Sequence, residues 1–436
     1  MRSPRISSLI VCSIALVYFC CNQLPAEQPT VDNASAVKLA SFQLPTSQSI
    51  QLFQKRVDQA PTDYLSRSLL GQLHLRHARE TGDLLSYKRA ETELQAALDV
   101  NPRHIGARSH LAQVYAAQHR FREALDIASQ IYDDDFDNLT ALATMGDAYL
   151  ELGNYKLAKR SFDLLFEQVQ SPPVLSRLAH FAELEGKNTR AIELMQSAID
   201  AAENEGISKT ELAWYDWRLG DLYFHTGDLK RARSHYQASL KRNPRYHIAV
   251  NGLADVAAAR GQIHEALGHL QASLALRQSP GTHAELAGLY GEVGDEASAK
   301  QHWIHAERLA TKPGIHTYVY KRTLAEIYCD QDKRLEEALT LARQELKQRP
   351  DLGGHDLVAW VLYKLGRFKE AAVESEKSLV MGINEPSFYY HAALIQHRCG
   401  NNDKAISYLK RIKSIADYLL PEDGLELLAK LEQESK

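Results

Sequence analysis

The chain has 436 residues, of which 44% are hydrophobic and 24% are charged, and its formal net charge at pH 7 is −4. These proportions are ordinary for a folded protein. The slight acidic excess gives no electrostatic basis for binding a nucleic-acid backbone, so we expect no nucleic-acid partner.

The first 26 residues are typical of an export signal. Arg2 and Arg5 precede an uncharged apolar stretch, and a small residue ends the Leu-Pro-Ala sequence at 24–26, where cleavage is expected. The apolar stretch is shorter than the roughly 20 residues that cross a membrane comfortably. We therefore expect an exported protein, in the periplasm, the cell envelope or outside the cell. The alternatives are an uncleaved signal anchor and a lipid anchor on Cys20 or Cys21, and in either case the membrane is contacted through this segment.

The next two segments lead into the main part of the chain. Residues 27–49 are rich in small and polar types, and they predict a flexible linker because they bury too little apolar area to offset their ordering. Residues 50–63 predict an N-terminal helix that caps the main part of the chain.

Residues 64–419 contain a unit that recurs about every 34 residues. Each unit has an alanine late in the repeat, and most units also have an apolar-then-small pair such as Leu219-Gly220 followed by a glycine such as Gly227. The alanines fall 33 to 41 residues apart: Ala90, Ala124, Ala158, Ala191, Ala232, Ala266, Ala299, Ala338, Ala371 and Ala405. The pattern predicts pairs of helices with a small residue at each close contact. Such a pair cannot bury its apolar face alone, so the pairs must stack.

Local departures from the period indicate where the array is interrupted. The spacing lengthens near 206–212 and near 313–317, and we expect breaks there. Ser208 followed by Glu211 predicts the N-cap of a helix just after the first break. Residues 420–436 predict a final amphipathic helix that caps the array.

Together these residues resemble the tetratricopeptide-repeat (TPR) family, with Trp217, Leu219, Gly220, Tyr223, Gly227, Ala232, Tyr236 and Pro244 as the fullest copy of the unit. The resemblance implies an all-α, right-handed superhelical solenoid of about ten antiparallel helix pairs. It also implies a role in binding other proteins.

In this family, positions two, five, nine, twelve and thirteen of each first helix line the concave surface. By that correspondence the aromatic residues of the groove are Trp214, Trp217, Phe224, Trp360, Tyr363 and Tyr390, and its carboxylates are Asp147, Asp221, Asp255 and Glu326. An acidic groove with aromatic patches suits an extended peptide that carries Lys or Arg. The alternative is that the carboxylates lie on solvated helix faces and that the next unit covers the aromatic rings.

Residues that could perform chemistry are sparse. His264 and His269 are five residues apart and diverge on a helix, while the pair His302 and His305 lacks further metal ligands. We therefore predict no catalytic residue, cofactor or metal, and a non-enzymatic scaffold that binds a protein or peptide, possibly a basic one, in its groove. The alternatives are an accessory module of an envelope enzyme complex that binds a small molecule or glycan, and a self-assembling structural element. The sequence leaves the oligomeric state open.

Overall fold

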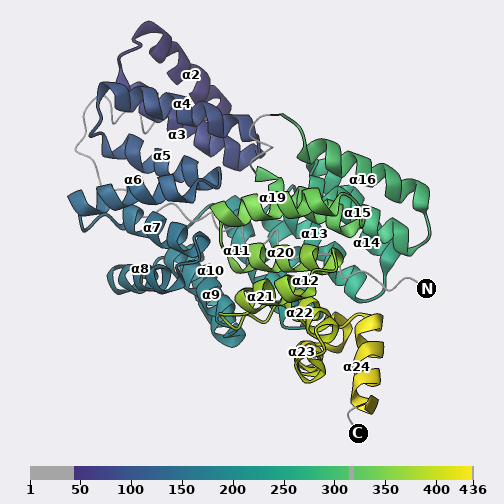
Figure 1. Ribbon diagram of the computed structural model, residues 1–436. Coiled ribbons are helices and arrows are strands. Elements are labelled where there is room, and N and C mark those ends of the chain that lie inside the picture. Colours follow the sequence, from purple (N-terminus) through teal and green to yellow (C-terminus); the bar gives the residue numbers. More distant parts are fainter. Residues whose placement is uncertain (1–43, 314–318, 435–436) are drawn as a thin grey trace. The chain divides into compact units, whose positions relative to one another are not determined.

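The computed structural model describes residues 44–313 and 319–434 (Figure 1). Over these residues the chain forms 22 α-helices, one short 3-10 helix and no strand, which confirms the all-α prediction. The expected export signal at 1–26, most of the expected linker at 27–49 and most of the expected break at 313–317 lie outside the described residues.

The described residues divide into two compact units. The N-terminal unit comprises residues 44–169 and holds α2 and then three helix pairs. Its helices are α2 (Thr46–Gln59), α3 (Tyr64–Thr81), α4 (Leu84–Val100), α5 (Ile105–Ala117), α6 (Phe121–Asp134), α7 (Leu139–Glu151) and α8 (Tyr155–Gln168).

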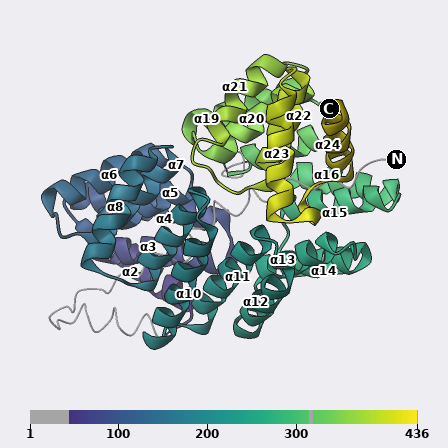
Figure 2. The same ribbon diagram turned by 90° about the horizontal axis from the view of Figure 1, so that it is seen from below.

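The C-terminal unit comprises Gln170–Lys312 and residues 320–434, and it holds seven helix pairs and a last helix. Its elements are α9 (Pro172–Leu184), α10 (Asn188–Asn204), α11 (Lys209–His225), α12 (Leu229–Arg242), α13 (His247–Ala259), α14 (Ile263–Leu276), α15 (Pro280–Glu292), α16 (Glu296–Ala310), α18 (Lys321–Asp330), α19 (Leu335–Gln348), α20 (Leu352–Lys364), α21 (Phe368–Ser378), α22 (Pro386–Arg398), α23 (Asn402–Ile415), η2 (Asp417–Leu419) and α24 (Glu422–Glu434). Figure 2 shows α20 to α24 lying side by side. The division between the units falls after residue 169, ahead of the stretch 206–212 where the sequence pattern placed a break.

Small residues bring the two helices of each pair together. Nine of the ten repeat alanines are 0% exposed, and Ala299 is 4% exposed. Two glycines, Gly220 on α11 and Gly252 on α13, likewise let these helices approach Tyr236 of α12. A Cβ added at Gly220 would lie 2.8 Å from the Tyr236 ring, and one added at Gly252 would lie 2.5 Å from it. Tyr236 thus fills space that its own repeat and the next leave open, and it is 1% exposed. The repeat therefore encodes packing within units and between them.

The helix ends obey local rules. The Ser208 hydroxyl accepts a hydrogen bond from the backbone N–H of Glu211 at 3.3 Å and donates one to its carboxylate at 2.7 Å, which confirms the predicted N-cap of α11. Pro102, Pro244 and Pro350 each lie two residues beyond the last residue of a second helix, where a missing N–H ends helical pairing.

The C-terminal unit also contains contacts between its first and last repeats. The Asn384 side-chain amide donates to the Gly186 carbonyl oxygen at 2.9 Å, although the two residues are 198 positions apart. Gly227, in the turn between α11 and α12, lies against the Ala416 side chain and the Ile415 carbonyl oxygen. The turns after α9 and α11 therefore touch the segments that flank α22 and α23, and the seven repeats close on themselves.

Candidate functional site

The first helices of successive repeats line one face of the C-terminal unit. Helix α11 contacts α13, α18 contacts both α15 and α20, and α20 contacts α22. Because these helices neighbour one another, side chains from several repeats meet on this face. We call it the groove face, and its residues fall into three groups: paired charges, carboxyls without partners, and aromatic rings.

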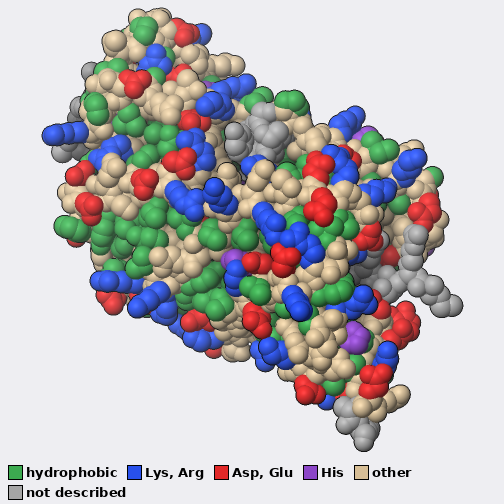
Figure 3. Space-filling view, viewed as in Figure 1, with side chains coloured by type: hydrophobic (Ala, Val, Ile, Leu, Met, Phe, Trp, Pro, Cys, Tyr) green, Lys and Arg blue, Asp and Glu red, His purple; other side chains and the backbone are tan. Residues whose placement is uncertain are grey.

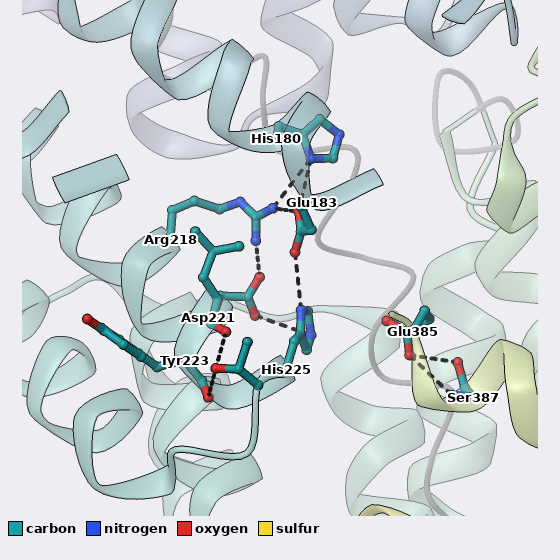
Figure 4. Close-up of polar contacts among 10 residues, drawn as sticks. His180, Glu183, Arg218, Asp221, Tyr223, His225, Glu385 and Ser387 are labelled. Carbon is teal, nitrogen blue, oxygen red and sulfur yellow. Dashed lines mark hydrogen bonds and ion pairs between the residues drawn. The ribbon is translucent and has the colours of Figure 1, made fainter. Parts of the chain in front are cut away.

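Paired charges occupy the groove face of α9 and α11 (Figure 4). The Arg218 guanidinium donates to Asp221 Oδ2 at 2.5 Å and also to Glu183 Oε2. Glu183 Oε1 in turn lies 3.3 Å from His225 Nδ1. These four residues are between 3% and 8% exposed, so each charge is held by its neighbours in place of water. Asp221, expected in the groove, is therefore already neutralised by Arg218.

The network changes the proton affinity of its members. Burial raises the pKa of the Glu183 carboxyl, but Arg218, His180 and His225 outweigh it and hold that pKa well below the ordinary value. Burial lowers the pKa of His225, yet the carboxylates of Asp221, Glu183 and Glu385 raise it to about 9. Glu385 belongs to the segment leading into α22 and accepts hydrogen bonds from Ser387 (Figure 4). His225 is therefore a cation at neutral pH, and it links α11 electrostatically to the last repeat.

Three further carboxyls on the groove face have no such partner. Asp255 on α13, Glu285 on α15 and Glu326 on α18 are half-buried and make no hydrogen bond or ion pair among the described residues. Burial and then Asp221 raise the pKa of Asp255 to about 7, although His225 opposes them. Burial and then Asp255 raise the pKa of Glu285 well above its ordinary value. Burial raises the pKa of Glu326 to about 8. Among the described residues, no hydrogen bond or ion pair compensates these three carboxyls, and their raised pKa values favour the protonated form.

The expected aromatic residues divide by exposure. Trp214, Trp217 and Phe224 are 1%, 3% and 9% exposed. Tyr246, at the entrance to α13, packs edge-on against Trp217 with ring centroids 6.5 Å apart. All three rings are therefore buried, which differs from the expectation of a groove patch open to a partner, and Tyr246 of the next repeat covers Trp217.

The other expected aromatic residues remain half-buried. The Trp360 ring stacks on the His391 ring, with centroids 4.0 Å apart, and on Tyr363 at 5.0 Å. The Tyr390 hydroxyl donates to Asp423 at 2.7 Å. Trp360, Tyr363 and His391 thus form a stacked column, which we call the aromatic column, on the groove face of α20 and α22.

One expected groove residue lies elsewhere, and the pattern missed several others. Asp147 lies on α7 of the N-terminal unit, where it is 4% exposed, so it does not belong to the groove face of the C-terminal unit. Arg218, Glu285 and His391 were missed. They occupy position six of their helices, counting Asp221 as position nine, and the concave positions of the family omit position six. A charge or imidazole recurring at that position was the available signal.

Further features of the described residues concern metal binding, membrane spans, thiols and surface charge. Within 44–313 and 319–434, no group of three or more His, Cys, Asp and Glu side chains is placed to hold a metal ion. No described helix is long and apolar enough to cross a membrane. Cys329 and Cys399 are free thiols. Lys and Arg side chains are interspersed with Asp and Glu over the face in Figure 3, in keeping with the small net charge.

Stacked helix pairs with a lined inner face define the class of helical-repeat proteins. Family models described as tetratricopeptide repeat match residues 171–245, residues 75–138 and 218–281, and residues 139–167 and 386–417. These matches cover more than half of the chain, and it belongs to the tetratricopeptide-repeat family.

Individual relatives are distant. The chain is 21% identical over 175 residues to stress-induced-phosphoprotein 1 of Caenorhabditis elegans, which is 38% of this chain and 50% of that protein. It is 25% identical over 157 residues to tetratricopeptide repeat protein 6 of Homo sapiens, which is 36% of this chain and 29% of that protein. The chain thus spans half or less of the length of these curated relatives.

Similarity to solved structures concerns the fold alone. A human IFIT1 dimer with PPP-AAAA aligns with a TM-score of 0.50 and 12% identity, covering 95% of this chain and 96% of that one. The APC/C hetero-tetramer Cut9-Hcn1 aligns with a TM-score of 0.34 and 12% identity, covering 92% and 96%.

Proposed function

We propose that the protein is a non-enzymatic interaction scaffold whose groove face in the C-terminal unit binds an extended, basic segment of a protein partner. Membership of the tetratricopeptide-repeat family supports a scaffold role. The observation that carries the finer proposal is the run of Asp255, Glu285 and Glu326, which make no ion pair and no side-chain hydrogen bond among the described residues.

The physical reason is the cost of leaving such groups without a counter-charge. A carboxylate in a partly desolvated site is unfavourable unless a cation or donors compensate it, and the raised pKa values of Asp255 and Glu326 report that cost. A Lys or Arg side chain from a partner would supply the missing charge. Because these carboxyls lie on α13, α15 and α18, a segment running across several repeats would meet them in turn.

The proposal is tested with a defined probe, a fluorescein-labelled peptide of repeating Gly-Lys-Leu triplets, and with a Gly-Glu-Leu counterpart. Fluorescence anisotropy should show binding of the lysine peptide alone, weakened by salt. The triple variant Asp255→Asn, Glu285→Gln, Glu326→Gln should bind about 1,000-fold more weakly, at about tenfold for each of the three charged contacts of roughly 1.4 kcal/mol.

A matched control removes the same charge elsewhere. Asp99, Asp126 and Asp133 are exposed carboxylates of the N-terminal unit that make no hydrogen bond or ion pair with the described residues. Changing all three to Asn should leave the affinity within about twofold of the parent, since exposed charges at a distance are screened. Equal weakening by both triple variants would mean that net charge alone governs binding, and the groove assignment would be wrong.

For the N-terminal segment we propose export with cleavage near residue 26, supported by the charged, apolar and small-residue order of residues 1–26. Sequencing the N-terminus of the protein isolated from its native compartment provides the test. A mature chain that still begins at Met1 would reject cleavage.

A further inference from the structure

Three histidines gather between α15 and α16, the two helices of one repeat of the C-terminal unit. His283 lies on α15, and His302 and His305 lie on α16. The centroid of the His283 ring is 5.1 Å from that of His302 and 5.3 Å from that of His305, and the His305 ring is stacked on it. His283 is only 5% exposed, and the other two are half-buried. The cluster is therefore part of the packing between the two helices.

Hydrogen bonds fix which nitrogen of the His283 ring carries a proton. The Gln278 amide nitrogen donates to the Leu274 carbonyl oxygen at 2.9 Å, so the amide oxygen is the atom that lies 2.9 Å from His283 Nε2. That oxygen can only accept, so Nε2 carries a proton and, in the neutral ring, Nδ1 does not. His302 Nδ1 lies 2.9 Å from His283 Nδ1 and must then be the donor of this pair. His283 is thus held in one neutral tautomer by a partner at each nitrogen.

A proton on His283 Nδ1 is incompatible with this arrangement. It would set one N–H against another, and the bond between α15 and α16 would be lost. His305 is also held neutral, because the Arg308 guanidinium donates to its Nδ1 at 2.9 Å and cannot accept. His302 can take up a proton on its other nitrogen and still donate to His283. The contact between the helices therefore depends on the protonation of His283.

No carboxylate compensates a charge on His283 among the described residues. The ionisable groups that act on it are all cations or able to become cations, and all lie on α16: His302, His305 and Arg308. Helices α14 and α18, which also contact α15, contribute none, and α13 contributes the uncharged Asn251, whose amide donates to Thr282 at 3.1 Å. Burial, followed by the three groups on α16, lowers the pKa of His283 to about 4.

We propose that this histidine cluster is an acid-sensitive latch, which holds α15 against α16 at neutral pH and releases them when His283 is protonated. The neutral ring stabilises the pair fully above its ordinary pKa of 6.5, and this contribution is lost as the pH falls towards 4. Because α15 also carries Glu285, acid would disturb the groove face. The latch is independent of the proposed function, since it concerns helix packing and needs no ligand.

The experiment is hydrogen–deuterium exchange of the full chain at pH 7 and at pH 5, with rates corrected for the intrinsic effect of pH on amide exchange. In the open pair His283 regains its ordinary pKa, so opening becomes about 20-fold more favourable at pH 5 than at pH 7. Amides of α15 and α16 should lose protection by that factor. His283→Asn should lose no more than about fivefold, because its carboxamide oxygen accepts from His302 whether or not that ring is charged.

A matched control separates the latch from a general effect of acid. His264→Asn removes an exposed imidazole from α14 in the preceding repeat, and α15 and α16 should then lose protection as in the parent. A parent chain that keeps its protection at pH 5 refutes the latch. A His283→Asn variant that loses as much protection as the parent refutes it too.

The ring nitrogens provide a second measurement that needs no variant to fold. In the parent chain with isotope-labelled histidine, nuclear magnetic resonance at pH 7 should show His283 with its proton on Nε2 and His302 with its proton on Nδ1. On acidification, protonation of His283 should accompany the loss of amide protection in α15 and α16. A cationic His283 in a pair that stays fully protected would overturn the proposal.

Discussion

Gly186→Ala should open the closure between the first and last repeats of the C-terminal unit. Gly186 has a φ of +69°, where an L-residue with a Cβ is strained by about 1 kcal/mol. An added Cβ would also collide with the Gly382 carbonyl oxygen, and moving that segment breaks the 2.9 Å hydrogen bond from Asn384 to the Gly186 carbonyl. Overpacking costs about 1–3 kcal/mol and the lost hydrogen bond about 1 kcal/mol, so the total is about 3–5 kcal/mol.

Gly261→Ala separates the two contributions. Gly261 has a φ of +72°, but an added Cβ there would have no atom within 4 Å, so this variant should lose only the conformational part, about 1 kcal/mol. The assay is hydrogen–deuterium exchange, which reports local opening in a chain of two units. Amides of residues 382–387 should exchange at least about 30-fold faster in Gly186→Ala, equivalent to about 2 kcal/mol, and unchanged in Gly261→Ala. Equal exchange of this segment in both variants would refute the closure as a stabilising contact.

The burial and charges of the C-terminal unit and the packing of α7 predict three further outcomes. Trp217→Ala should destabilise the C-terminal unit by about 3–5 kcal/mol in thermal or denaturant unfolding, since the ring is 3% exposed; loss of binding without loss of stability would contradict its interior placement. The pKa of His225 is about 9 in the folded protein against an ordinary 6.5. The protonated imidazole therefore stabilises the folded state fully below pH 6.5, and this contribution of about 3 kcal/mol is lost as the pH rises through 9. His225→Gln should remove that slope from the pH dependence of the free energy of unfolding. Gly146→Ala places a Cβ 2.5 Å from the Phe162 ring, and this overpacking should lower the free energy of local opening by about 1–3 kcal/mol. The amides of α7 and α8 should then exchange faster. Parent-like exchange would show that the ring can shift freely.

The fold was predictable because its determinants are local and repeated. The alanine of each second helix and the glycine of most turns recur with the period, and the packing of Tyr236 between Gly220 and Gly252 uses only adjacent repeats. The N-cap at Ser208 depends on four consecutive residues. Interactions of this range appear in any sequence that contains the repeat.

The candidate site was predictable only in part, because neighbouring residues decide which aromatic rings are buried and which carboxylates have a charged partner. Trp217 and Trp360 both fit groove positions, but Tyr246 packs against the first while the second stays half-open. Asp221 and Asp255 also share a position, yet only Asp221 has an arginine one turn earlier on its own helix to neutralise it. A position within a repeat specifies a direction, and it does not specify the exposure or the partner of the side chain.

The paired and the unpaired groove carboxyls lie on different repeats of the C-terminal unit. Glu183 and Asp221 lie where α9 and α11 face the segment leading into α22, and Arg218 and His225 compensate them there. Asp255, Glu285 and Glu326 lie on the repeats between the two ends of the closure, and they make no ion pair among the described residues. If a basic partner completes these sites, binding to the folded state alone must stabilise it, by about 2.7 kcal/mol at a free concentration about 100 times the Kd. Gly186→Ala, which acts on the closure and not on these carboxyls, should therefore lower the stability of the free protein while leaving the salt dependence of peptide binding unchanged.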